Sequence, residues 1–275
     1  MAQRLDETHS PRFTRFHLLL AVVSTVVIAV FFFFPPITVL DKAHAIGYGI
    51  CHQLPASTFH YAGIPLPLCA RCTGIYLGAV MGVVGIVLLG RGRSVELPPT
   101  HILVVLLGFI GVMGFDGINS FLSAIPRAPH LYEPQDWLRL TTGTLHGLAM
   151  AVIVFPIFNR SIWHADRIKI EPVMGNLKEL TFFLIGAAVI ILLVLWQHPL
   201  LLYPLTVLST VGVMMMMGFI NTVFVLVLIR REEKAQTWGD VAIPVAMGLA
   251  VSFLMISGLG ALRTVLMAMT ELAAL

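Results

Sequence analysis

The residues with the clearest chemical potential are three cysteines and a histidine in one segment. Cys51 precedes His52, Cys69 and Cys72 follow with the two-residue spacing of a chelating pair, and the chain has no other cysteine. Three thiolates and one imidazole suit tetrahedral zinc. Cys69 and Cys72 also stand where an apolar helix is predicted to begin, and a helix N-terminus favours the thiolate that a metal requires. The pattern therefore predicts a site for one zinc ion, or another thiolate-binding metal, on Cys51, His52, Cys69 and Cys72.

Other uses of these cysteines stay open on the sequence alone. In an oxidising compartment Cys69 and Cys72 can form a disulfide, either structural or redox-active as in membrane thiol oxidoreductases, which leaves the third thiol unpaired. The cysteines could also have no chemical role and only stabilise the structure of this segment. The fourth metal ligand is open too, because His44 and His60 are as reachable as His52.

A second polar group lies at the ends of two later apolar segments. Asp116 and Asn119 end one of them, and Arg139 and Thr142 begin the next. An ionisable side chain near membrane depth normally needs a partner, and Asp116 would find one in Arg139, in Arg71 or in a metal. We expect these residues to surround the metal ligands or to bind an anion. The alternative is an Asp116–Arg139 ion pair that only joins two helices.

The composition decides which solvent the surface faces. Of the 275 residues 58% are hydrophobic and 11% are charged, and the mean hydropathy is +0.92. Soluble domains carry about 25% charged residues, so a surface with so few charges must face lipid. The net charge of +3 then reflects where basic residues lie about a bilayer and does not indicate nucleic-acid binding. The lipid bilayer is the first partner that we expect.

Seven segments reach the length of about 20 apolar residues that a spanning helix needs. They are roughly 17–35, 73–90, 101–119, 139–158, 179–197, 204–229 and 241–264. We therefore predict an all-α, polytopic protein with one membrane domain over 1–275. On one side of this arrangement lie 12 of the 17 basic residues. The positive-inside rule then predicts a multi-pass protein of the cytoplasmic (inner) membrane, with the N-terminus inside and the C-terminus outside. The loops of roughly 36–72 and 116–138 would both face the extracytoplasmic side.

The segments 73–90 and 139–158 open alike. Aligning their Thr-Gly pairs superposes a second glycine and a methionine, at Gly78 and Met81 in one and Gly147 and Met150 in the other. Glycines four residues apart let helices approach closely. Arg71 and Arg139 stand at the two helix mouths, which is an anion-attracting arrangement, and a phosphate, a carboxylate or a lipid head group is a candidate guest.

The cysteine segment is similar to a known family. Cys51-His52-Gln53, followed by the run from Cys69 to Gly78, resembles the signature of a bacterial and archaeal family of predicted membrane proteins of unknown function (domain of unknown function 2085). Asp116, Asn119, Arg139 and Thr142-Gly143 are similar to a second block of that family. The resemblance covers roughly 44–150 and leaves 179–264 as a possible extension. The resemblance implies no particular activity. It does imply that one site contains a set of eight residues: Cys51, His52, Cys69, Arg71, Cys72, Asp116, Asn119 and Arg139.

Three functions are compatible with these observations. The first is a membrane protein with an outward-facing Cys/His metal site. The second is a thiol–disulfide redox enzyme that uses Cys69 and Cys72. The third is a non-enzymatic accessory subunit of a membrane complex. The sequence does not decide between an enzyme and a non-enzymatic protein.

Overall fold

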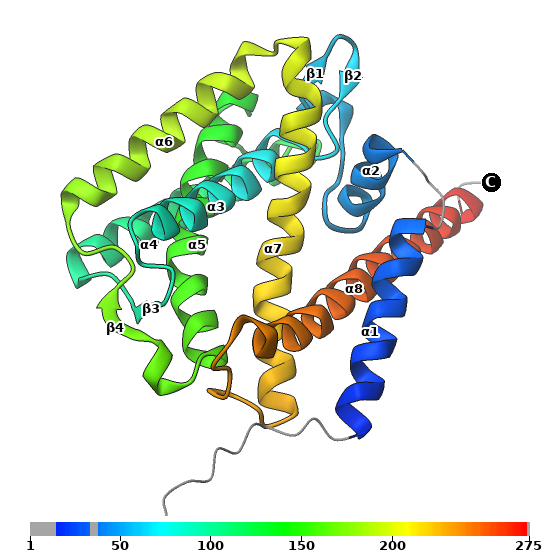
Figure 1. The fold of residues 1–275 in the computed structure, drawn as a ribbon. Coiled ribbons are helices and arrows are strands. Elements are labelled where there is room, and N and C mark those ends of the chain that lie inside the picture. The colour runs from blue at the N-terminus through cyan, green and yellow to red at the C-terminus, as the bar shows by residue number, and fades with distance from the viewer. Residues whose placement is uncertain (1–14, 34–37, 274–275) are drawn as a thin grey trace, which may run out of the picture.

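Long helices dominate the architecture, as the sequence predicts. The computed structural model describes residues 15–33 and 38–273 (Figure 1). Its long helices are α1 (Arg15–Phe33), α3 (Ala70–Leu88), α4 (Thr100–Ser123), α5 (Asp136–Ile162), α6 (Leu177–Trp196), α7 (Leu202–Leu228) and α8 (Trp238–Ala273). Within the described residues six of these, α3 to α8, are long and apolar enough to cross a membrane. The all-α polytopic fold is thereby confirmed.

The helices follow the expected spans closely, with one large difference at the end. Helix α1 lies over the first expected span, whose last two residues, 34 and 35, fall outside the described residues. Helix α8 continues past the expected end at residue 264 to Ala273. The helix continues because the residues after 264 are mainly good helix formers such as leucine, methionine and alanine.

The segment before the cysteines is more ordered than a loop. It forms α2 (Val39–Ile50), which begins where the Thr38 hydroxyl accepts the backbone N–H of Asp41. A hairpin of β1 (His60–Tyr61) and β2 (Ile64–Pro65) follows, and its turn residues Ala62 and Gly63 both have positive φ. The fully buried Tyr61 donates from its hydroxyl to the Val194 carbonyl at 2.7 Å, which fixes the hairpin to the end of α6.

The bundle has two distinct ends. Figure 1 shows α2 and the β1–β2 hairpin at one end, which we call the cysteine end. The parallel strands β3 (Ser94–Glu96) and β4 (Lys169–Pro172) lie at the other, which we call the β3–β4 end. Helices α3, α5 and α7 start at the cysteine end, because each follows a connection located there.

Among the described elements, α3 and α5 share the most extensive contact. A Cβ atom on Gly74 would lie 2.4 Å from the Leu140 carbonyl oxygen, and one on Gly143 would lie 2.4 Å from that of Arg71. The same reciprocity recurs one turn later at Gly78 and Gly147. The matching glycines of the two helices therefore bring the helix backbones into contact and set the positions of the arginines that precede them.

Candidate metal centre

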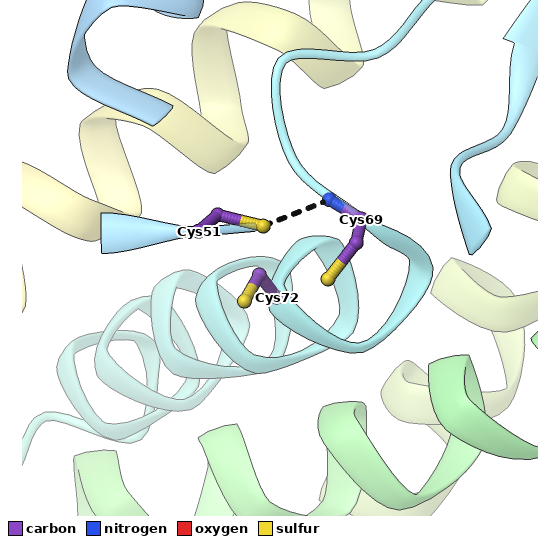
Figure 2. A group of neighbouring side chains, drawn as sticks. All are labelled: Cys51, Cys69 and Cys72. Atoms are coloured by element: carbon purple, nitrogen blue, oxygen red, sulfur yellow. Dashed lines mark hydrogen bonds between the residues drawn. The ribbon is translucent and has the colours of Figure 1, made fainter. Parts of the chain in front are cut away.

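Three sulfur atoms meet where α2 ends and α3 begins. Cys51 follows the last residue of α2, Cys69 immediately precedes α3, and Cys72 lies in the first turn of α3. Figure 2 shows their side chains gathered at the start of α3. All three sulfurs lie within 4.8 Å of one another, and none of the thiols is in a disulfide. Cys51 is buried and the other two are half-buried. Cys51 and Cys69, which are 18 positions apart in the chain, thus come together at the start of α3.

Gln53 holds these two segments together. Its side-chain amide donates to the His44 carbonyl at 3.0 Å and to the Pro67 carbonyl at 2.7 Å. Gln53 has φ of +50°, a backbone conformation that turns the chain sharply after Cys51. A Cβ atom on Gly47 would lie 2.2 Å from the Pro67 oxygen, so the end of α2 sits directly on the segment that leads to α3.

Arg263 of α8 binds the backbone on either side of Cys51. Its guanidinium donates to the Cys51 carbonyl at 2.7 Å, to the Tyr48 carbonyl at 3.1 Å and to the His52 carbonyl at 2.8 Å. It also lies over the Tyr48 ring, 4.3 Å from its centroid. The last carbonyls of a helix lack partners within the helix, and here an arginine supplies them. The backbone that carries Cys51 is therefore fixed on both sides.

The surroundings of Cys51 favour a thiolate. The backbone N–H of Cys69 donates to the Cys51 sulfur at 3.3 Å, drawn as the dashed line in Figure 2. Hydrogen bonds from the Cys69 and Cys72 thiols lower the pKa of Cys51 below its usual range. Zinc–sulfur bonds of about 2.3 Å at tetrahedral angles place sulfurs about 3.8 Å apart. The donor set and its spacing therefore fit a thiolate-bound metal.

No histidine joins the sulfurs among the described residues. The group within 4.8 Å consists of Cys51, Cys69 and Cys72, and the side chain of His52 is exposed. His60 is exposed as well, and His44 is half-buried on α2. The structure thus brings together three of the four ligands that the spacing predicts.

Arg71 and Asp116 form a separate polar cluster between α3 and α4. Arg71 donates from Nε to the Asp116 carboxylate at 3.2 Å and from its terminal nitrogen to Ser120 at 2.8 Å. The Tyr132 hydroxyl donates to the other carboxylate oxygen at 2.8 Å. Asp116 is only 1% exposed, and the guanidinium of Arg71 balances its charge inside the protein. Asp116 pairs with Arg71 rather than with Arg139, which pairs with Asp136 at 3.3 Å.

The remaining candidate residues organise backbone. Asn119 donates to the Tyr132 carbonyl and accepts the Leu131 N–H, both at 2.8 Å, and so holds the loop between α4 and α5. Thr142 donates to the Leu138 carbonyl of its own helix at 3.0 Å.

The two clusters occupy different faces of one helix start. Cys69 and Cys72 pack with residues of α2 and α7, whereas Arg71 is bound to α4. At 3.6 residues per turn, neighbouring residues point about 100° apart.

Sequence reasoning missed Gln53, Tyr132 and Arg263 as positioning residues. A charge near the end of an apolar helix was the one signal for Arg263.

The comparisons with known proteins concern the first half of the bundle. Residues 51–153 match the model of a family described as predicted membrane protein (DUF2085). An uncharacterised protein of Methanocaldococcus jannaschii is 29% identical over 114 residues, 42% of this chain and 67% of the relative. One of Methanothermobacter thermautotrophicus is 32% identical over 104 residues, 38% of this chain and 83% of the relative. No solved structure matches.

Proposed function

The chain belongs to the DUF2085 family of predicted membrane proteins, and from this premise we propose that it is a metal-binding membrane protein whose Cys51, Cys69 and Cys72 hold one zinc ion. The observation that carries the proposal is the convergence of all three cysteines of the chain within 4.8 Å. Thiolate ligands select zinc and other soft metals over magnesium or calcium. His52, which follows Cys51 directly, is the candidate for the fourth ligand.

The supports around Cys51 favour a metal over an accidental cluster. A zinc site needs its ligands oriented by hydrogen bonds beyond the ligand sphere. Gln53 and Arg263 provide five such bonds to the two segments that carry the thiols. The ion would join the end of α2 to the start of α3. The surplus of basic residues on the other side of the bilayer supports an extracytoplasmic position for this centre.

Elemental analysis of the gently purified protein, with thiol counting under denaturing and non-reducing conditions, tests the proposal. We expect about one zinc ion per chain and three free thiols. Each of Cys51→Ser, Cys69→Ser and Cys72→Ser should lose the ion, because each variant leaves at most three of the four protein ligands that a structural zinc site uses. Absence of metal together with a single free thiol would overturn the proposal and favour the thiol–disulfide enzyme.

Histidine variants assign the fourth ligand. His52→Ala should weaken zinc retention against a chelator, and His60→Ala, which removes an exposed histidine of the same segment, should not. Retention equal to that of the parent protein in both variants would exclude His52 and His60 and leave the fourth position to His44 or water. Cobalt substitution gives a second readout, because the intensity of the thiolate-to-cobalt absorption reports how many sulfurs bind the ion.

A further inference from the structure

The β3–β4 end contains a pocket that is independent of the metal centre. It has a volume of about 650 Å³ and lies where α3 ends, between α5, α7 and α8. Aromatic and aliphatic side chains form most of its wall, among them Phe155, Phe158, Phe219 and Val245. The rings of Phe158 and Phe219 stack with centroids 4.4 Å apart. The wall therefore suits a hydrocarbon chain.

Arg93 lies at the rim of this pocket with its hydrogen-bonding capacity unused. Its guanidinium lies 4.4 Å from the ring centroid of Trp163 and 5.6 Å from that of Trp238. The guanidinium forms no hydrogen bond or ion pair with any residue that the structure describes. Arg91, two residues earlier, differs in that it donates to the Pro172 carbonyl at 2.8 Å and to Glu179 at 2.7 Å. The five N–H donors of Arg93 are thus available to a ligand.

Backbone pairing places a second cation beside Arg93. The Lys169 N–H donates to the Arg93 carbonyl at 2.9 Å where β3 and β4 pair. Lys169 lines the pocket, and its ammonium group donates to the Gly90 carbonyl at 3.1 Å and lies 3.7 Å from the Glu171 carboxylate. The buried amide of Asn159 donates to the carbonyls of Gly92 and Ser94, which fixes the turn that carries Arg93. Two basic side chains are therefore held at one rim.

We propose that this pocket binds an anionic phospholipid, with Arg93 and Lys169 on its phosphate and the start of an acyl chain along the aromatic wall. Basic pockets between spanning helices recognise anionic head groups in this way. Tryptophans commonly lie at the head-group level of a bilayer, and Trp163 and Trp238 border this rim. An apolar wall below two cations is complementary to a charged amphiphile and not to a neutral one.

Tryptophan fluorescence can report the lipid directly. Trp137 and Trp196 lie exposed at the cysteine end, so the Trp137→Phe/Trp196→Phe background leaves only Trp163 and Trp238. The full chain is reconstituted in phosphatidylcholine bilayers with increasing fractions of brominated phosphatidylglycerol or brominated phosphatidylcholine. Because one basic residue near a charged head group changes relative affinity about fivefold, we expect half-maximal quenching at a roughly fivefold lower fraction of the anionic lipid.

Variants of the two cations connect this preference with the pocket. Arg93→Gln and Lys169→Gln should each lower the preference, and the double variant should bring it towards one. Arg160→Gln removes the same charge from an exposed position in the last turn of α5, outside the pocket, and should retain it. Lys169 keeps the proposal testable if Arg93→Gln does not fold, because its side chain is 56% exposed.

Three outcomes would overturn the proposal. The first is equal quenching by the two lipids in the parent protein. The second is an unchanged preference in both Arg93→Gln and Lys169→Gln. The third is release of the brominated lipid by millimolar inorganic phosphate, which would assign the site to a soluble anion.

Discussion

At the scale of single residues, the Arg71–Asp116 pair places a carboxylate inside the protein. The carboxylate is 1% exposed, and a buried charge without its partner costs about 3–5 kcal/mol. We therefore expect Arg71→Gln to lower the free energy of unfolding by about that amount in detergent micelles. Arg71→Gln combined with Asp116→Asn should recover part of the loss, because it removes the orphaned charge.

Arg139 supplies the matched control for that prediction. It stands at the start of α5 much as Arg71 stands at the start of α3, but its partner Asp136 is a third exposed. A pair whose carboxylate is partly exposed to solvent contributes about 1 kcal/mol or less. Equal destabilisation by Arg71→Gln and Arg139→Gln would contradict a special role for the buried pair. Unfolding midpoints of the variants, measured in one detergent, decide between the two.

Residue types and spacing could predict the cysteines but not every partner. The Cys-x-x-Cys spacing is local, and the third thiol lay in the same segment. The direction of the His52 side chain was not predictable, because it depends on the positive φ of Gln53 and on Arg263, which lies more than two hundred residues away. The partner of Asp116 was equally open, since it depends on the rotation of α3 against α4.

At the scale of elements, the α3–α5 contact predicts a sharp difference between glycines. A Cβ atom on Gly147 would lie 1.9 Å from the Ile75 carbonyl oxygen, whereas one on Gly111 of α4 meets nothing within 4 Å. We expect Gly147→Ala to destabilise the protein by about 1–3 kcal/mol through overpacking. Gly111→Ala should be neutral or stabilise by up to about 1 kcal/mol, because alanine favours a helix.

Thermal unfolding of the two glycine variants in detergent is the measurement. Similar midpoints for Gly147→Ala and Gly111→Ala would show that the helices can separate at no cost, against the close packing described above. A lower zinc content in Gly147→Ala alone would add that the α3–α5 contact supports the start of α3 and, with it, Cys69 and Cys72.

Hydropathy predicted the spanning helices because each is a long apolar run. It missed α2 and the hairpin because these elements are short and not continuously apolar. Helix α2 is short and amphipathic, and its start depends on a side-chain cap at Thr38. The hairpin turn places Ala62 at positive φ, a conformation that alanine rarely adopts and that no pattern of the sequence announced.

At the scale of the whole molecule, the family match contains the three cysteines but not all of the residues that support them. The match covers residues 51–153 and ends within α5. Helix α8 lies outside it, yet α8 packs against α1, α2 and α7 and supplies Arg263 to the backbone around Cys51. The later helices are therefore part of the wall of the centre in this chain.

This arrangement predicts that a residue far from the family match controls metal retention. Arg263→Gln removes the donors to the carbonyls of Tyr48, Cys51 and His52 and leaves every thiol in place. Loss of a supporting hydrogen bond typically lowers metal affinity by about 10- to 100-fold, so we expect zinc transfer to a chelator at least about tenfold faster. Thr264→Val is the matched control, because it alters the adjacent residue, whose hydroxyl meets the Tyr48 side chain at 3.3 Å and none of those carbonyls. Equal transfer rates in the parent protein and Arg263→Gln would mean that Gln53 and the start of α3 hold Cys51 without α8.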